Sequence, residues 1–170
     1  MAGIVRGRQT ARPGADGVVV FLIGMRINRV WQVWKWVPVF TAMARMLPEL
    51  LRNRDLGLLG RPRTFVSGRV IEVQQYWSSF EALEAYARDP DRRHLPAWRA
   101  FNRRVGGNGA VGIFHETYRV GPGDLETVYV NLPPFGLAAA VGAEAVVAGA
   151  QSAAQRLGTR AEDSPPVEPY

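Results

Sequence analysis

The stretch Val18-Val19-Val20-Phe21-Leu22-Ile23 decides the fold. It is continuously apolar and mostly β-branched, a pattern typical of a strand that is buried on both faces. A helix is predicted to begin near Val37, with Pro38 tolerated in its first turn. Its expected buried stripe is spaced three or four residues apart and consists of Val37, Phe40, Ala44, Leu47 and Leu51. The folded part of the chain therefore begins with a strand and a helix packed on it.

The same alternation continues along the chain. Two strands are predicted over residues 64–66 and 69–77, and Ser78 or Ser79 can cap a helix that follows them. The later predicted elements are a helix that contains His94, a strand over residues 110–118 and an added strand over residues 125–132. The resulting order, β-α-β-β-α-β, is that of a ferredoxin-like α+β fold, an antiparallel sheet with its helices on one face.

Such a sheet leaves its other face without a covering layer. An exposed apolar face of this size needs a partner, and two sheets that face each other form a dimeric α+β barrel. We therefore expect a homodimer with two-fold symmetry. The ligand pocket would lie either between the sheet and its own helices or inside the barrel.

Composition divides the chain into four segments. Residues 1–14 are expected to form a flexible N-terminal arm, and residues 15–137 the ferredoxin-like barrel domain. Residues 138–158 are rich in alanine and predict an extension that is helical or partly loop, because glycines interrupt it. Residues 159–170 are acidic and rich in proline, a composition typical of a disordered tail.

Charge and cysteine content narrow the function classes. The chain has no cysteine, which excludes disulfides, thiolate haem ligation and thiol catalysis. Its net charge is +6, but the basic residues are scattered, so no nucleic-acid partner is expected. The N-terminus lacks the apolar core of a signal peptide, and no stretch is a convincing membrane span. A cytoplasmic protein without a membrane partner is the expectation.

The two histidines of the chain are the candidate catalytic residues. His94 begins a helical stripe with Trp98, Phe101 and Val105, positions that lie within about 40° of one another around a helix. His115 lies inside the apolar strand 110–118. A histidine on an apolar face is more often a packed core residue than a ligand. Because these two lie in adjacent elements, they could also stand on opposite sides of one bound cofactor.

Three runs of sequence carry a family resemblance: residues 75–87 (QYWSSFEALEAYA), 94–98 (HLPAW) and 112–118 (GIFHETY). They resemble a bacterial and fungal family of monooxygenase-like proteins, related to the barrel monooxygenase of fumagillin biosynthesis. The resemblance covers residues 18–137 and extends weakly to residues 154–158. It implies the dimeric α+β barrel fold and an oxygenase-like activity.

A more distant resemblance connects the chain to the C-terminal half of the haem-containing aldoxime dehydratases. It implies that His94 is the axial ligand of haem b and that His115 is the distal catalytic histidine. Trp98, Phe101 and Ile113 could form the apolar slot that a haem requires. This chain is about half as long as the dehydratases, and their catalytic serine has no clear counterpart in it.

Three functions remain open at this point. The first is a haem-dependent oxidoreductase or lyase that acts on a small apolar substrate by oxygenation or at a nitrogen–oxygen bond. The second is a barrel monooxygenase that uses no cofactor, with His115 as a base. The third is a barrel that binds a ligand or haem without turnover.

Two further predictions concern residues near the histidines and before the first helix. Glu116 should point to the face of the strand opposite to His115. The tryptophans at positions 31, 34 and 36 either line the mouth of a substrate pocket or make core or dimer contacts.

Overall fold

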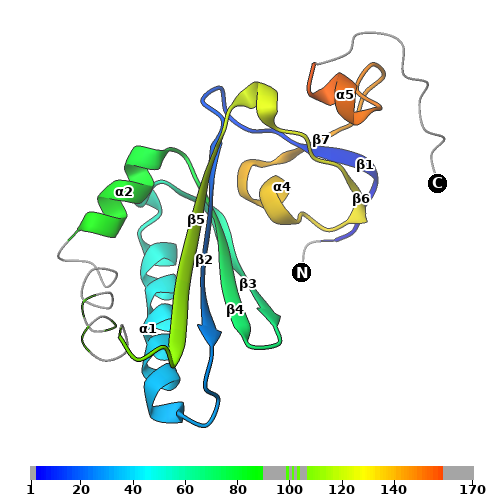
Figure 1. The fold of residues 1–170 in the computed structure, drawn as a ribbon. Coiled ribbons are helices and arrows are strands. Elements are labelled where there is room, and N and C mark those ends of the chain that lie inside the picture. The colour runs from blue at the N-terminus through cyan, green and yellow to red at the C-terminus, as the bar shows by residue number, and fades with distance from the viewer. Residues whose placement is uncertain (1–2, 90–98, 100, 102, 104–106, 159–170) are drawn as a thin grey trace. The chain divides into compact units, whose positions relative to one another are not determined.

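The computed structural model describes residues 3–89, 99, 101, 103 and 107–158. The chain separates into two compact units (Figure 1). The larger unit spans Val19–Tyr118, and the smaller unit combines Met1–Val18 with Arg119–Tyr170. Each unit is built around its own sheet, and the candidate histidines both belong to the larger unit.

The larger unit contains a four-stranded sheet of order β3-β4-β2-β5. Its strands are β2 (Val18–Ile27), β3 (Leu58–Ser67), β4 (Val70–Trp77) and β5 (Val111–Val120). Strand β4 pairs antiparallel with both β2 and β3. This strand order is that of the ferredoxin-like fold, so the predicted α+β fold class is confirmed.

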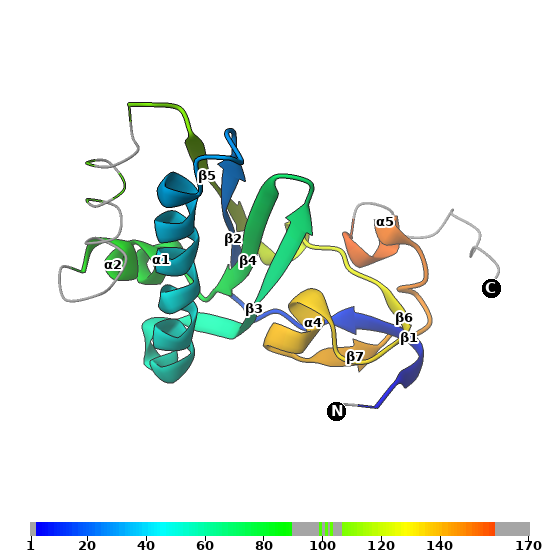
Figure 2. The same ribbon diagram turned by 90° about the horizontal axis from the view of Figure 1, so that it is seen from below.

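Two helices lie on the same side of this sheet: α1 (Val33–Arg52) and α2 (Phe80–Arg88) (Figures 1 and 2). A short 3-10 helix, η1 (Arg54–Leu56), follows α1. Helix α2 begins where the sequence predicts, because the Ser79 hydroxyl accepts a hydrogen bond from the Ala82 N–H at 3.1 Å. Helix α1 begins four residues earlier than Val37, so Trp34 and Trp36 belong to the helix and not to the connection before it.

The buried side of α1 differs from the predicted stripe. Val39 and Leu50 are buried in it, and Trp36 and Met43 are partly buried, whereas Val37 and Phe40 are each 40% exposed. The reason is that α1 carries apolar residues over two adjacent stripes. Spacing alone does not show which of them faces the sheet.

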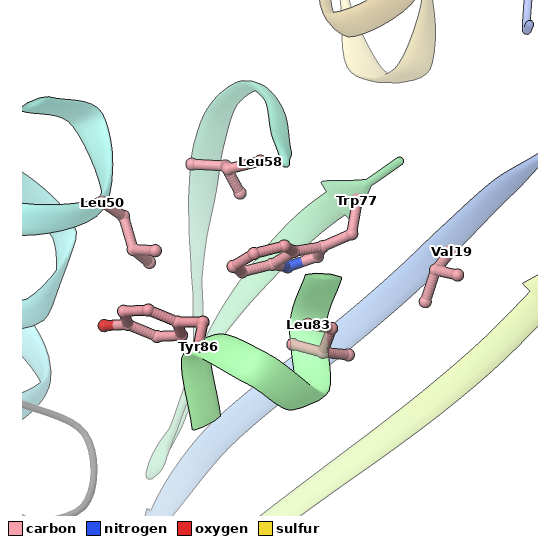
Figure 3. Packing of buried hydrophobic residues seen from close by; sticks show 6 residues of the cluster. All are labelled: Val19, Leu50, Leu58, Trp77, Leu83 and Tyr86. Carbon is pink, nitrogen blue, oxygen red and sulfur yellow. The ribbon is translucent and has the colours of Figure 1, made fainter. Parts of the chain in front are cut away.

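The core under the helices has two clusters. One lies around Trp77, which is fully buried, and includes Leu50 of α1 and Tyr86 of α2 (Figure 3). The other lies around Met25, Val39 and Val111. The sheet residues in both clusters alternate along their strands and therefore share one face. We call it the helix-covered face; its members are Val19, Phe21, Ile23, Met25, Ile71, Val73, Gln75, Trp77, Val111, Ile113 and His115.

The smaller unit contains a three-stranded sheet of order β6-β1-β7. Its strands are β1 (Val5–Ala11), β6 (Tyr129–Leu132) and β7 (Ala143–Ala145), and both neighbours of β1 are antiparallel to it. The unit also holds η2 (Pro122–Asp124), α4 (Gly136–Val141) and α5 (Ala153–Arg156). Arg156 donates from Nε to the Glu126 carboxylate at 2.7 Å and from Nη1 to the carbonyl oxygens of Ala150 and Gln151. These hydrogen bonds connect α5 to residues 150–151, which directly precede it, and to Glu126.

Two predictions about this part of the chain differ from the structure. Half of the expected flexible arm, residues 1–14, forms strand β1 (7 residues), because β6 and β7 supply hydrogen-bond partners on both of its edges. The added strand expected over residues 125–132 is shorter and joins this second sheet instead of the ferredoxin-like one. The alanine-rich segment 138–158, expected to be helical or partly loop, contains the end of α4, strand β7 and α5, and Gly142 ends α4 with a φ of 93°. The predicted tail, residues 159–170, lies outside the described residues.

Candidate functional site

An apolar pocket opens between α1, α2 and the helix-covered face of the sheet. The space between these elements, counted together with the open solvent at its mouth, is roughly 370 Å³. Strands β2 and β4 contribute Phe21, Ile23, Val73 and Gln75 to the lining. The helices contribute Met43, Met46, Leu47, Leu50 and Tyr86. None of these lining residues carries a formal charge, so the pocket favours an uncharged ligand.

His115 lies on the same face of the sheet as this pocket. Its ring centroid is 6.0 Å from that of Phe21, which lines the pocket, and the two rings are tilted by 41°. The His115 side chain remains solvent-exposed in part, so it is not a buried core histidine. Glu116 points to the opposite face, as predicted, where it accepts a hydrogen bond from the Tyr118 hydroxyl. His115 is therefore an exposed residue of the helix-covered face, next to a residue that lines the pocket.

Two of the predicted haem-slot residues come together. Ile113 and Phe101 both pack against the cluster of Met25, Val39 and Val111, below the same face that carries His115. Both therefore contribute apolar surface to this cluster. His94 and Trp98, the predicted iron ligand and the third slot residue, lie outside the described residues.

The three tryptophans at the start of α1 separate in the structure. Trp36 packs against the Met25 cluster and donates from Nε1 to the Val30 carbonyl oxygen at 3.0 Å. Trp31 and Trp34 are 66% and 65% exposed. The core interpretation therefore holds for Trp36 alone.

Sequence reasoning missed Gln75, a polar residue in the lining of this apolar pocket. It is 6% exposed, and its Oε1 accepts a hydrogen bond from the Trp77 indole N–H at 2.9 Å. The available signal was its spacing, because Gln75 lies between Val73 and Trp77 on the same face of one strand. A lone glutamine among apolar residues two positions away on each side marks a buried polar position.

The second face of the sheet, turned away from α1 and α2, is chemically mixed. It carries Leu22, Gly24, Glu72, Gln74, Phe65, Arg63, Phe114, Glu116 and Tyr118, in register across the strands. The Arg63 guanidinium lies 4.8 Å from the centre of the Phe65 ring. The hydrogen bond to Glu116, and then the negative charge of that carboxylate, raises the pKa of the Tyr118 phenol. The phenol is therefore held in its neutral form.

The donor set of the site suits a macrocycle better than a bare metal ion. Within the part of the chain that the structure describes, no three histidine, aspartate or glutamate side chains gather as metal ligands. A haem needs only one or two axial ligands and otherwise an apolar slot. Phe21 supplies apolar surface beside His115, and Ile113 lies two residues away on the same face of β5, so these residues fit one side of a haem pocket.

The strand order, the helices on one face and the apolar pocket beneath them define a class: ferredoxin-like α+β domains with a small-molecule pocket. The chain belongs to the Monooxygenase af470-like family, whose model matches residues 18–137. It is 32% identical over 153 residues to Monooxygenase af470 of Aspergillus fumigatus, with 79% of this chain and 54% of that protein covered. The chain thus spans about half the length of the curated relative that it matches.

Solved aldoxime dehydratases share this fold. One in complex with butyraldoxime has a TM-score of 0.64 at 16% identity, covering 79% of this chain and 40% of its own. Another has a TM-score of 0.65 at 20% identity, covering 86% of this chain and 45% of its own. Both resemblances seen in the sequence are confirmed, the monooxygenase-like family by its model and the dehydratases at the level of fold.

Among the described residues, no helix is both long and apolar enough to cross a membrane.

Proposed function

We propose that the protein is a haem-binding enzyme acting on a small, largely apolar substrate, with His94 as the axial iron ligand and His115 as the distal acid–base group. The observation that carries the proposal is the position of His115 beside Phe21, on the face of the sheet that forms the apolar pocket. The more distant resemblance to the haem-containing dehydratases, which matches His94 to their axial ligand and His115 to their distal histidine, supports the two histidine roles.

Each part of the proposed site has a physical task. Bound haem would supply an iron centre for oxygenation or for chemistry at a nitrogen–oxygen bond. Phe101 and Ile113, with Trp98, would provide apolar surface for the macrocycle. His115 would hold or transfer a proton at whichever of Nδ1 and Nε2 faces the substrate, since the ordinary pKa of histidine lies near neutrality. Phe21 limits the orientations that the imidazole can take.

A second candidate is a monooxygenase that uses no cofactor. It requires only residues that the structure describes: the apolar pocket for the substrate and His115 as the base that removes a proton from it. In this case His94 would be a structural residue. A third candidate, binding of haem or another ligand without turnover, keeps the pocket but gives His115 no role in proton transfer.

Titration with haem distinguishes these candidates. Wild-type protein and His115→Phe should bind one haem with a Soret band, whereas His94→Phe should bind it weakly or with a different spectrum. Phenylalanine preserves the packing volume at both sites, so the pair of variants is matched. Normal haem binding by His94→Phe would overturn the axial assignment.

Turnover then separates an enzyme from a binding protein. Oxygen consumption and butyraldoxime dehydration can both be assayed, because relatives and structural neighbours bear these names. His115→Phe should lose roughly 10²–10⁴-fold of the rate that the wild type shows, as expected for removal of a positioned acid–base group. An unchanged rate would contradict the distal role of His115.

We also propose that the protein forms a homodimer through the second face of the ferredoxin-like sheet. Phe65 is 41% exposed on this face, which also carries the half-buried Leu22 and Phe114 on other strands. Packing against a second copy would remove this apolar surface from water. Light scattering at micromolar concentration should give twice the chain mass of 18.8 kDa, and a monomer would refute the proposal.

A further inference from the structure

Gln75 is the one carboxamide in the lining of the pocket. It is 6% exposed, and its neighbours on the helix-covered face are Val73, Trp77 and Phe21, the last of these directly across on β2. Placing a polar side chain in such surroundings is unfavourable unless its donors and acceptors find partners. We therefore expect a hydrogen-bond partner both for the oxygen and for the nitrogen of the carboxamide.

Trp77 determines which end of the Gln75 carboxamide faces which way. An indole N–H can only donate a hydrogen bond, so the atom 2.9 Å from it must be the glutamine oxygen. The amide nitrogen then points away from Trp77. The bond from Trp77 is the only one that the Gln75 carboxamide makes to the described residues. Among the described residues, none accepts a hydrogen bond from the two amide hydrogens, and Gln75 lines the pocket.

We propose that the amide nitrogen of Gln75 is the polar anchor of the pocket and selects uncharged ligands that carry a hydrogen-bond acceptor, such as a carbonyl or an oxime. The apolar remainder of the ligand would contact Phe21, Met43 and Leu50, which line the same pocket. A carboxylate is disfavoured, because the lining residues that the structure describes include no cation to balance it. A purely apolar ligand would leave the amide without a partner.

This inference deepens the proposed function, because it assumes that the pocket beside His115 is the substrate pocket. It assigns Gln75 a positioning role: the acceptor on the substrate is held at β4 while the rest of the molecule lies under α1. Trp77 acts on the ligand only indirectly, because its hydrogen bond to Gln75 fixes the rotation of the carboxamide.

Two probes of the same shape test this role without haem and without turnover. Acetophenone carries a carbonyl group where isopropylbenzene carries a methine and a methyl group. The readout is the ratio of their dissociation constants, measured on the full chain by titration calorimetry or ligand-detected NMR. We define the ratio as the dissociation constant of isopropylbenzene divided by that of acetophenone. This ratio should be roughly tenfold higher in the wild type than in Gln75→Met, because the variant loses one hydrogen bond in a buried site. Methionine has a similar length, so the pocket keeps its shape.

Gln74→Met is the matched control, because Gln74 is the adjacent residue on β4 and points to the second face. It should leave the ratio at the wild-type value, whereas Trp77→Phe should lower it by freeing the Gln75 carboxamide to rotate. An equal ratio in the wild type and Gln75→Met, or the same change in Gln74→Met, would overturn the inference.

A second measurement does not depend on any variant. In the wild type, the side-chain amide resonances of Gln75 should shift on addition of acetophenone and hardly at all with isopropylbenzene. Equal shifts with both probes would count against the proposal. Because neither experiment contains haem, the selectivity for acceptors can hold even if the haem assignment fails, and it can fail while haem binding holds.

Discussion

Neighbouring residues on β4 enter two different environments. Val73 and Gln75 face α1 and the pocket, and both are more than nine-tenths buried. Glu72 and Gln74 point to the second face and lie opposite Gly24 and Leu22. The same contrast occurs on β5, where His115 stands beside Phe21 while Glu116 pairs with Tyr118. The same sheet therefore has an apolar face that carries the pocket and a chemically mixed face that suits contact with another protein surface.

The contrast shows where the chemistry of this fold can lie. An acid–base group works best where the substrate is held, and the helix-covered face places an apolar pocket next to Phe21, the neighbour of His115. On the second face, the acid–base pair of Glu116 and Tyr118 keeps its proton on the phenol, because the carboxylate raises the pKa of Tyr118. That pair is poorly suited to proton transfer near neutral pH.

Truncation of Trp77 should show the largest difference between the faces. Its side chain is completely buried between Leu50, Leu58 and Tyr86 (Figure 3). Trp77→Ala should lower the free energy of unfolding by about 3–5 kcal/mol, which chemical denaturation can measure. Phe65→Ala, on the second face, should have a much smaller effect because its ring is already 41% exposed. Equal losses for the two variants would mean that both faces are packed alike.

A smaller effect is expected at Gly24, which lies under the Phe114 ring on the second face. A Cβ added at this position would lie 2.8 Å from the Ile71 carbonyl oxygen and even closer to the Phe114 ring. Because the carbonyl oxygen is part of the backbone, it has little freedom to move away. Gly24→Ala should therefore cost about 1–3 kcal/mol of unfolding free energy. Gly68→Ala provides a control without a steric contact, although its φ of 54° adds some backbone strain. An unchanged stability for Gly24→Ala would show that Phe114 packs elsewhere.

Sequence patterns predicted the ferredoxin-like unit well, because its strands and helices are close in the chain and carry their own signals. The apolar run at residues 18–23 and the Ser79 cap both lie where expected. Strand β1 was missed because its partners β6 and β7 are more than a hundred residues away, and its own residues have no apolar alternation. Such a strand is specified by its neighbours more than by its sequence.

The candidate site was predicted in part. His115, Ile113 and Phe101 share one face, as the apolar pattern of the strand and the helical spacing indicated. The contribution of α1 was predicted only in part, since Leu47 of the predicted stripe lines the pocket but Met43, Met46 and Leu50 do so as well. Gln75 was missed because its polarity made the strand look exposed on both faces, whereas the indole of Trp77 compensates for its burial.

The smallest expected effect concerns the second face alone. Glu116→Gln removes the negative charge beside Tyr118 and should lower the pKa of its phenol toward the ordinary value. Since the folded-state pKa is raised, the interaction is fully present below the pKa of an unfolded tyrosine and is lost as pH rises through the folded value. In an ultraviolet titration, the Tyr118 phenol should ionise at a lower pH in Glu116→Gln than in the wild type. The binding of haem and of the two probes should stay unchanged. A phenol pKa that does not move would mean that Glu116 has no influence on it.

Methyl NMR of labelled methionine most directly tests the claim that the ligand site lies on the helix-covered face. Met43 and Met46 line the pocket, and Leu22→Met places a reporter on the second face, next to Ile23 along β2. Unpaired electrons of a haem iron shift and broaden the signals of nearby methyl groups. Addition of haem should affect Met43 and Met46 strongly and the reporter at position 22 much less. If the reporter at position 22 responds most while Met43 and Met46 stay unchanged, the ligand site is on the other face and the central claim is wrong.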